Sequence, residues 1–330
     1  MSIPASMQAI IIKQPGQNSY LECAQIAVPK MNANQLLIKV AAAGVNRADL
    51  VQRQGLYPPP AGESDILGLE VAGTVVATPA ELQHWIGKQV FGLVPGGGYA
   101  EYAVLHHQHA IIVPEGYSMI EAAATAEVFL TAYQLLRWHG QLSVQQKVLI
   151  HAGASGVGTA AIQLAKFFDA IVAVTASTDE KLALCRRLGA DILVNYKQDK
   201  FEDVLAKCWP DGADLILDSV AGDYIHRNIA ILGLDAKIVI YAMMGGRHLP
   251  ELDLVPLFKQ RGQLIFSTLR NRSDAYKANL TKDFIKNCGI ALTEKKIQPI
   301  IYKTFNWQQA ADAHQLMASN QTQGKLVLEF

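Results

Sequence analysis

The sequence has few cysteines and no excess of charge of either sign. Its 330 residues include only four cysteines, Cys23, Cys185, Cys208 and Cys288, and no C-x-x-C motif. So few and so widely spaced thiols argue against a secreted disulfide framework or a cysteine-rich zinc lobe, and they favour a reducing compartment. The 29 Lys and Arg residues cancel the 29 Asp and Glu residues. We therefore expect no partner that is a nucleic acid or an anionic membrane.

Long apolar runs are also missing. None reaches the ~18 residues needed to span a membrane, and the stretch from Met1 to Gly16 has no basic segment followed by an apolar one. These absences predict a cytoplasmic protein. What is present is enough apolar sequence for large cores, since 50% of the residues are hydrophobic. At roughly 100–200 residues per domain, a chain of this length predicts two domains.

The pattern of strand-like and helix-like segments changes near residue 128. Before that point it is a series of short strand-like segments, interrupted by the turn-rich stretch Pro58–Gly62 and the loop Pro95–Gly98. Loops of this kind often line a cleft. The segments predict a compact, strand-dominated unit; they are Gln8–Lys13, Gln35–Ala42, Val71–Ala77, Gln89–Leu93 and Glu101–Leu105.

From Glu127 onward, strand-like and helix-like runs alternate, which is typical of βαβ units around a buried parallel sheet. In the first of these helices, apolar residues recur from Val157 to Phe168 at helical spacing and predict one apolar face. After Asn271 come a helix and a last strand, Lys325–Glu329, that can rejoin the first unit. The predicted parallel strands are Lys147–Ala152, Ile171–Thr175, Ile192–Val194, Asp214–Leu217, Lys237–Tyr241 and Gln263–Ser267.

A glycine-rich turn follows the first of these strands and opens a helix. In the register of the G-x-G-x-x-G motif, its three positions are Gly153, Ser155 and Gly158, with Gly156 beside the substituted one. Glycines here allow a tight turn, close approach of the backbone to a pyrophosphate, and close packing of helix on strand. The helix N-terminus adds unpaired N–H groups for the phosphates. We interpret this turn as a dinucleotide site; the alternative is a tight βα turn without a ligand.

The end of the next strand bears on which dinucleotide binds. An NAD site requires an acidic residue about 20 residues past the motif, but this strand ends without one, and Ser177 and Lys181 follow instead. A hydroxyl and a cation suit a 2′-phosphate, which favours NADPH. Against this, Ser177 and Glu180 have the spacing of a capping box, and two nearby carboxylates would repel a phosphate. Tyr196, after the third strand, either flanks the adenosine or is a half-buried packing aromatic.

The sequence gives weaker support for a hydrolase or a metal site. A serine-hydrolase G-x-S-x-G motif fails because Val157 occupies the position of its second glycine. His106, His107 and His109 lie close together, but successive strand residues face opposite ways and no further ligand has suitable spacing. We therefore expect solvated or capping histidines and no metal site.

Taken together, nine short motifs resemble the zinc-free NADPH quinone oxidoreductases of the medium-chain dehydrogenase/reductase superfamily, and within them the tumour-suppressor-inducible branch. The resemblance spans nearly the whole chain. The motifs are Gly44–Asp49, Arg53–Tyr57, Gly68–Gly73, Pro95–Gly98, His151–Gly158, Ile216–Ser219, Lys259–Gly262, Leu269–Arg270 and Gly324–Glu329.

The resemblance implies an α/β protein with a GroES-like β-rich catalytic domain, residues 1–128 and 272–330, and a Rossmann domain, residues 129–271, with the active cleft at their junction. Zinc-dependent relatives place a cysteine and a histidine where this chain has Asn46 and Leu69. The resemblance thus implies an enzyme without zinc, and self-association as a homodimer or a dimer-based tetramer.

The resemblance also implies roles for single residues. Asn46, Tyr57 and Ser155 are the expected catalytic residues, with Tyr57 bordering the substrate. Asp49 and Glu70 are more simply read as hydrogen-bonding supports of the loop backbone. Asn46 could instead cap the chain, Tyr57 could pack as an ordinary aromatic, and Met243 and Met244 could fill the core. The expected cofactor contacts are Asn46, Thr131, Gly153, Ser155, Gly156, Val157, Gly158, Ser177, Lys181, Tyr196, Met243, Gly245 and Lys325.

A quinone or an activated alkene accepts hydride without a Lewis acid, whereas alcohol oxidation usually requires one. The sequence therefore predicts an NADPH-dependent quinone reductase that needs no metal. An enoyl or alkenal double-bond reductase is the alternative enzyme. A non-catalytic NADPH-binding sensor or structural protein is the alternative of another class, because fold does not fix function.

Overall fold

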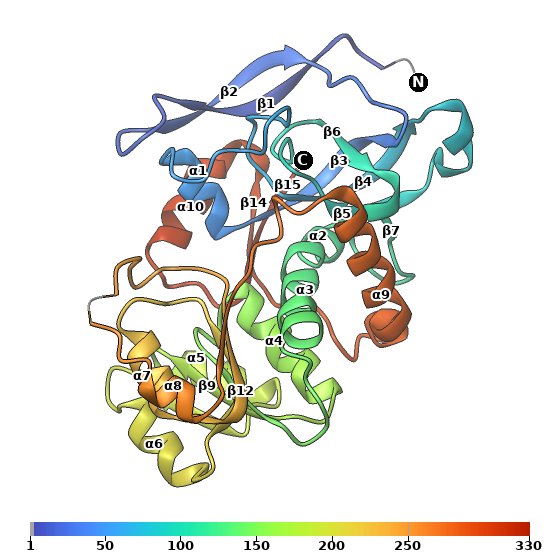
Figure 1. The fold of residues 1–330 in the computed structure, drawn as a ribbon. Helices are drawn as coiled ribbons and strands as arrows, with labels where there is room; N and C mark the ends of the chain where they lie inside the picture. Colours follow the sequence, from blue (N-terminus) through green and yellow to red (C-terminus); the bar gives the residue numbers. More distant parts are fainter. Residues whose placement is uncertain (1–2, 250) are drawn as a thin grey trace. The chain divides into compact units, whose positions relative to one another are not determined.

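The computed structural model describes residues 3–249 and 251–330 (Figure 1). The chain forms two compact units. Unit 1 contains the chain up to Leu130 together with Leu269–Phe330, and unit 2 is Thr131–Thr268. The predicted domain ranges put the borders at residues 128 and 272, a few residues from these. Among the described helices, none combines the length and the apolar character needed to cross a membrane.

Unit 1 is built on a sheet in the order β14-β15-β3-β4-β5-β7, with β6 also paired to β3, and on a separate β1-β2 hairpin. The apolar side chains of these strands form one core, which includes Leu36, Val71 and Leu328. The strands are β1 (Ser6–Lys13), β2 (Tyr20–Ala27), β3 (Gln35–Val45), β4 (Glu70–Ala77), β5 (Gln89–Leu93), β6 (Tyr102–His106), β7 (Ile111–Ile112), β14 (Ile301–Asn306) and β15 (Lys325–Glu329).

Strand β15 does rejoin the first unit. It pairs antiparallel with β3, with Leu326 opposite Val45, and parallel with β14. This pairing brings Lys325 beside the C-terminal end of β3, where helix α1 begins. The helices of unit 1 are α1 (Arg47–Arg53), η1 (Ala80–Trp85), η2 (His107–His109), α2 (Met119–Ala123), α9 (Asp274–Thr293), η4 (Trp307–Gln309) and α10 (Ala310–Ala318); α3 (Ala126–Tyr133) crosses the border.

Unit 2 contains a six-stranded parallel sheet in the order β10-β9-β8-β11-β12-β13. Figure 1 labels two of its strands, β9 and β12. All six predicted strands are present, and the predicted α/β class is confirmed. The strands are β8 (Lys147–Ile150), β9 (Ile171–Ala176), β10 (Ile192–Asn195), β11 (Ala213–Asp218), β12 (Leu232–Ile240) and β13 (Gln263–Phe266). The helices are η3 (Gln134–His139), α4 (Gly156–Phe167), α5 (Asp179–Arg187), α6 (Phe201–Cys208), α7 (Tyr224–Ala230) and α8 (Val255–Lys259).

The order of this sheet reverses direction between β8 and β11, because β9 and β10 extend it on one side and β12 and β13 on the other. Ligands of open α/β sheets bind outside the carboxyl ends of the strands at such a switch point. The loops after β8, β9, β10 and β12 all leave this edge. They carry most of the predicted cofactor residues.

Helix α4 differs from the expectation of a single apolar face. Every residue from Gly158 to Ala165 is buried, including Thr159 and Gln163. The Gln163 amide is satisfied within the helix, because its Nε2 donates to Thr159 O at 3.0 Å. The helix is therefore enclosed on more than one side.

Candidate active site

The loop between β8 and α4 makes a sharp turn. Ala152 has φ +53°, and the Gly153 N–H donates to Thr175 O at 3.0 Å, which holds the turn against β9. A Cβ on Gly158 would lie 2.4 Å from Ala152 O, and a Cβ on Gly153 would lie 2.8 Å from Val174 Cβ. Both positions therefore require glycine for the close approach that a dinucleotide-binding turn makes.

Ser155 begins helix α4 as its N-cap. Its Oγ accepts a hydrogen bond from the Gly158 N–H at 3.0 Å. The α4 N-terminus is the positive end of a 12-residue helix and follows a parallel strand at the switch point, which is an arrangement suited to phosphate binding. The residues present thus fit a dinucleotide, with Ser155, Gly156 and Val157 nearest its phosphates; the individual contacts stay predictions.

A buried polar network fixes the base of this loop. The His151 ring lies 2.8 Å from Asn228 Oδ1 and 3.0 Å from Thr175 Oγ1. Asn228 in turn donates to Asp218 Oδ2 at 2.9 Å. Burial lowers the pKa of His151, so the ring is held neutral as a structural link between β8, β9 and α7.

Ser177 and Lys181 lie together after β9, since Lys181 Nζ donates to Ser177 Oγ at 3.3 Å. The capping-box interpretation of Ser177 is wrong. Helix α5 begins at Asp179, and its N-cap is Thr178, whose hydroxyl accepts from the Lys181 N–H. The Ser177 hydroxyl is therefore not used as a cap, because the chain turns into the helix one residue later than the sequence pattern indicates.

One of the two acidic residues beside this pair is already engaged. Asp179 Oδ1 accepts from Asn195 Nδ2 at 3.0 Å, which ties α5 to the end of β10. Tyr196, the next residue, has an exposed fraction of 42%, so it is available to a ligand; its contact with adenosine stays a prediction.

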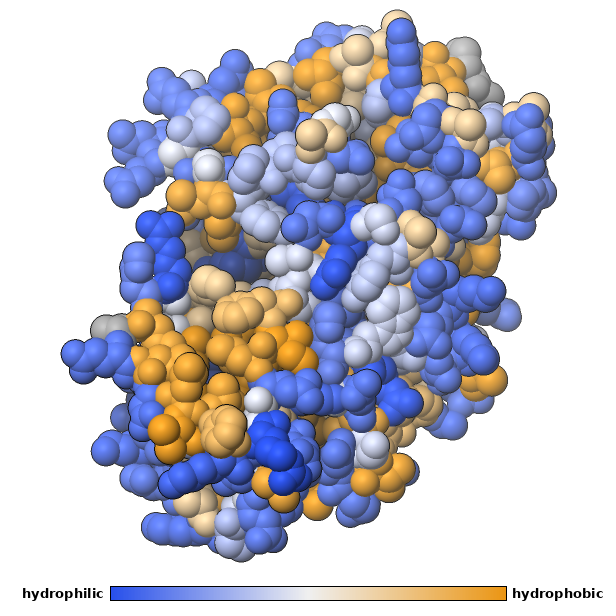
Figure 2. Space-filling view, viewed as in Figure 1, coloured by the Kyte–Doolittle hydropathy of each residue, from blue (hydrophilic) through white to orange (hydrophobic). Residues whose placement is uncertain are grey.

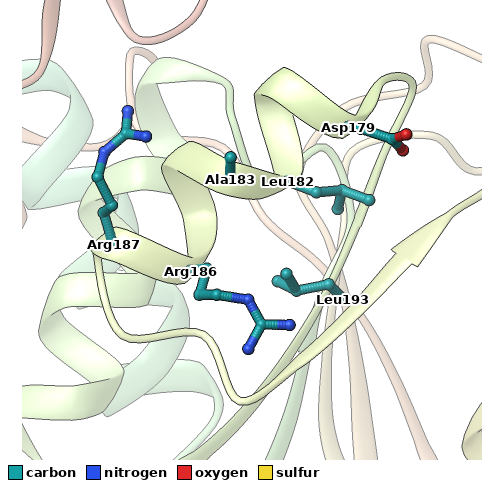
Figure 3. A pocket seen from close by; sticks show the side chains of 6 residues that line it. All are labelled: Asp179, Leu182, Ala183, Arg186, Arg187 and Leu193. Carbon is teal, nitrogen blue, oxygen red and sulfur yellow. The ribbon is translucent and has the colours of Figure 1, made fainter.

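An open hollow of about 520 Å³ lies beside these residues, between α5 and β10. Figure 3 shows the Arg186 and Leu193 side chains on the same side of the helix, with Asp179 at its start. None of the predicted cofactor residues lines this hollow. Its lining is Asp179, Leu182, Ala183, Arg186, Arg187 and Leu193.

The segment after β12 is held by backbone bonds. The Gly245 N–H donates to Val220 O at 2.7 Å, and the Met244 N–H donates to Ser219 O at 3.1 Å. Met243 and Met244 are half exposed, with fractions of 50% and 52%. The alternative in which they fill the core is therefore wrong, and their contact with a cofactor stays a prediction. Thr131 is half-buried in α3, and its contact with a cofactor also stays a prediction.

In unit 1, the buried side chains of Asn46, Glu70 and Lys325 form one network. Lys325 Nζ donates to Glu70 Oε1 and to Asn46 Oδ1, each at 2.7 Å, and to Val45 O at 2.9 Å. Asn46 Nδ2 donates to Glu70 Oε1 at 3.0 Å, and the Glu127 N–H donates to Glu70 Oε2 at 2.8 Å. All three donors of Lys325 meet protein oxygens, so its predicted cofactor contact stays a prediction.

Asp49 supports the backbone, as the sequence indicated. Its carboxylate accepts from the N–H groups of Asn46 at 2.8 Å and Gly68 at 3.1 Å, and from the Tyr99 hydroxyl at 3.0 Å. Asn46 also caps helix α1 in a capping box with Asp49. Complete burial raises the pKa of Asp49 to about 6, although its hydrogen bonds oppose the shift.

Tyr57 lies in the loop after α1, under the guanidinium of Arg270 at 5.4 Å from ring centroid to Cζ. Arg270 Nε donates to Pro95 O at 2.8 Å, and Nη1 donates to Tyr57 O at 3.4 Å. Arg270 thereby joins the loop that begins at Pro95 to the residue just before the predicted stretch Pro58–Gly62. Burial, with Glu127 nearby, raises the pKa of the Tyr57 hydroxyl, which therefore stays protonated and able to donate.

Two families match the two halves of this architecture. The alcohol dehydrogenase GroES-like domain matches residues 32–115, and the zinc-binding dehydrogenase family matches residues 156–284. Prostaglandin reductase-3 of Mus musculus is 30% identical over 76% of this chain and 67% of its own length. This chain belongs to the medium-chain dehydrogenase/reductase superfamily. The chain has the GroES-like and Rossmann parts of this superfamily, and the predicted fold is confirmed.

Other relatives extend the comparison. A phenolphthiocerol/phthiocerol polyketide synthase of Mycobacterium tuberculosis is 27% identical over 97% of this chain, which spans only 14% of that protein. The structure of mycobacterial Rv1454c complexed with NADPH is 26% identical, covers 98% of this chain and all of its own chain, and has a TM-score of 0.87. These relatives differ widely in size and in name.

Although the name of one matching family includes zinc, the residues here do not fit a catalytic zinc ion. Where zinc-dependent members place a cysteine, Asn46 holds the Lys325 ammonium, and the neighbouring Glu70 oxygens are occupied by hydrogen bonds. Within residues 3–249 and 251–330, no group of three or more His, Cys, Asp or Glu is arranged to hold a metal.

The histidine group of the sequence has structural partners. His106 Nδ1 accepts from the Gln108 N–H at 3.2 Å as the cap of η2, which confirms a capping histidine. His109 is not solvated, contrary to the expectation. It is buried and lies 3.0 Å from Asp274 O, and burial lowers its pKa to about 4.

Sequence reasoning missed Glu127 and Lys277, which lie beside the predicted site residues of unit 1. Burial and the Glu70 carboxylate raise the pKa of Glu127 to about 7. Lys277 is buried in α9. A signal for it exists in the sequence, because Lys277 falls on the helical stripe formed by Leu280, Phe284 and Cys288. A lysine in an otherwise apolar stripe marks a buried charge.

Proposed function

We propose that this chain is an NADPH-dependent quinone reductase that works without a metal. The observation that carries the proposal is the buried Lys325 ammonium bound to Asn46 and Glu70, because Asn46 stands where zinc-dependent relatives place a cysteine and its side-chain oxygen is already bound to a cation. Such a site suits acceptors that take hydride without a Lewis acid, and quinones are the strongest of these. The finer kinship with the tumour-suppressor-inducible branch is part of this proposal.

Three features support NADPH as the donor. The α4 N-terminus follows β8 at the switch point, Ser177 and Lys181 provide a hydroxyl and a cation after β9, and Asp179 is tied to Asn195. The related Rv1454c structure contains the same dinucleotide. When bound, NADPH supplies the hydride.

The residues of this chain bind the dinucleotide and orient the acceptor. Ser155, Gly156 and Val157 hold phosphates at the start of α4, and Lys181 binds the 2′-phosphate. Asn46 presents a surface that is fixed on both sides, because Lys325 and Glu70 hold its amide and Asp49 holds its backbone N–H. Tyr57, kept protonated, donates a hydrogen bond to an acceptor carbonyl.

The decisive experiment follows NADPH oxidation by the purified protein with an ortho-quinone, a para-quinone and an alkenal in parallel, with NADH as the control donor. Rapid turnover with a quinone and NADPH supports the proposal. Tight NADPH binding without turnover on any acceptor would instead favour the non-catalytic binding protein.

The second candidate is a double-bond reductase acting on activated alkenes. The kinship with a protein named prostaglandin reductase-3 favours it, and the same metal-independent site suits an enone. A higher kcat/KM for the alkenal than for either quinone would establish this activity in place of the first.

We also propose self-association through the β13 edge of unit 2. β13 is the last strand of the sheet, and the neighbouring α8 exposes apolar side chains; Figure 2 shows an orange area over this helix. Exposed apolar surface of this extent is typical of an interface. Sedimentation velocity tests this, with Phe258→Ser expected to favour the monomer. The exposed residues are Leu254, Val255, Phe258 and Phe266.

A further inference from the structure

One nitrogen of a buried arginine in unit 1 has no hydrogen-bond partner. Arg270 has an exposed fraction of 8%, and its Nε and Nη1 donate to the carbonyl oxygens of Pro95 and Tyr57. Within the described part of the chain, its Nη2 meets no acceptor. A buried charged donor without an acceptor is costly, so this nitrogen is suited to an oxygen from outside the protein.

Arg270 lines a small cavity. The cavity measures about 10 Å³, and a second buried cation, Lys277, with an exposed fraction of 7%, also lines it. This volume admits about one water-sized oxygen atom. The remaining lining is Leu69, Leu93, Val94, Glu127 and Leu269.

Nearby carboxylates do not supply the acceptor that Arg270 Nη2 lacks. Glu63, Asp274 and Glu127 act on Lys277 through space, and Glu63, Asp49 and Glu127 act on Arg270. Among the described residues, no ion pair joins Glu63, Asp49 or Asp274 to Arg270 or Lys277, and Arg270 Nη2 has no hydrogen-bond partner. Arg270 Nη2 therefore keeps one hydrogen bond to give inside the cavity.

We propose that this cavity is an oxyanion subsite in which Arg270 Nη2, assisted by Lys277, binds the acceptor oxygen that becomes negatively charged during reduction. This inference rests on the proposed function and names the part of the acceptor that the chain recognises. The acceptor oxygen accepts the hydrogen bond that Arg270 Nη2 has to give.

The charge balance of the reaction supports an oxygen anion at this point. The C–H bond of the dihydronicotinamide breaks and hydride bonds to one quinone oxygen; the ring electrons rearrange, the negative charge develops on the other oxygen, and the products are a hydroquinone monoanion and NADP⁺. A proton from solvent then completes the hydroquinone. A donor that is already fixed where this charge develops stabilises the transition state more than the neutral acceptor.

The test uses 4-nitrophenol, whose absorbance reports its ionisation and which resembles the monoanion without being reduced. Binding is measured with and without NADP⁺. The wild-type protein is expected to bind the phenolate form and to lower the apparent pKa of the bound phenol. Lys277→Met and Arg270→Lys are expected to weaken phenolate binding about tenfold or more, as loss of a charge-assisted bond does.

Matched variants separate this effect from general damage. Lys282→Met changes an exposed lysine of the same helix, and Arg272→Lys changes an arginine that lies over Tyr276 instead of the cavity. Both should bind the phenolate as the wild type does. Lys277→Met keeps the test valid if Arg270→Lys disturbs the two loops, since Arg270 and not Lys277 holds those loops together.

The outcomes distinguish the two proposals. If no acceptor is reduced but phenolate binding depends on Arg270 and Lys277, the reductase proposal fails and the cavity remains a site that binds an oxygen anion. If quinones are reduced and the variants match the wild type in both phenolate binding and kcat/KM, only a water occupies the cavity and the subsite is refuted.

Discussion

The Lys325 ammonium lies 2.7 Å from Glu70 Oε1, although 255 residues separate the two along the chain. Both side chains are almost fully buried, with exposed fractions of 2% and 0%. Removing one partner of such a pair leaves a buried charge without compensation. The pair therefore controls the stability of unit 1 as well as the position of Asn46.

Lys325→Met is expected to lower the free energy of unfolding by about 3–5 kcal/mol, because Glu70 then stays buried without a cation. Combining it with Glu70→Gln should recover part of the loss. Urea unfolding followed by circular dichroism measures both effects. Lys295→Met, which removes an exposed pair with Glu121, should cost less than ~1 kcal/mol; equal losses in the two single variants would contradict this account.

Lys181→Ala is expected to weaken NADPH binding about tenfold or more while changing NADH binding little, since a charge-assisted bond to phosphate contributes about 1.5–3 kcal/mol. Fluorescence titration gives both dissociation constants. Lys207→Ala, an exposed lysine of α6, serves as the control. Equal losses for the two dinucleotides would remove the reason for assigning the 2′-phosphate to this position.

Gly158→Ala and Gly289→Ala are expected to have opposite effects. A Cβ at residue 158 would meet Ala152 O at 2.4 Å, whereas a Cβ at residue 289 has only Ile285 Cγ2, at 3.4 Å. We expect the first to cost about 1–3 kcal/mol and to weaken dinucleotide binding. The second should stabilise α9 by up to about 1 kcal/mol. Thermal unfolding with and without NADPH checks both effects. If Gly158→Ala changes neither the stability nor the dinucleotide binding, helix α4 does not require glycine at this position.

Glu127 is expected to make stability fall as the pH rises. Burial first, and Glu70 second, raise its pKa from 4.5 to about 7, while Lys325 and Lys277 oppose the shift and Asp49 adds to it. Between pH 4.5 and about pH 7, the Glu127 carboxyl loses its proton in the unfolded chain and keeps it in the folded chain. Its contribution to the free energy of unfolding therefore declines through this window.

Glu127→Gln removes this dependence. Relative to the wild type, the variant should gain stability between pH 5 and pH 8, which urea midpoints at the two pH values measure. Glu115→Gln, at an exposed position, should keep a constant difference. The same constant difference for Glu127→Gln would show that its carboxyl titrates as it does in the unfolded chain.

Much of the fold follows from local pattern, and the exceptions have a physical cause. The six parallel strands are predicted because each is a short apolar run, and the central ones, β8, β9 and β11, are buried on both faces. Strand β2 is missed because it pairs only with β1 and is mostly exposed, so polar residues such as Glu22 and Gln25 interrupt any apolar alternation. Strand β14, at the edge of the sheet that begins β14-β15-β3, is also largely exposed.

In the candidate site, too, local features could be predicted and non-local contacts could not. The loop from His151 to Gly158 could be predicted because its turn, cap and helix are contiguous. The contact of Lys325 with Asn46 could not, because it depends on the register of β15 against β3, which the whole sheet sets. The cavity at Arg270 is also non-local, since Leu69, Glu127 and Lys277 come from separate segments.

The pairing of β15 with β3 also imposes an order in time. While the chain is synthesised, Val45 emerges long before Leu326, its partner in the sheet. At ~5–20 residues per second, the interval between Glu70 and Lys325 lasts roughly ten to fifty seconds. All of unit 2 is made within that interval. A growing chain therefore contains all of the nucleotide-binding unit before the buried charge of Glu70 meets its counter-ion, Lys325.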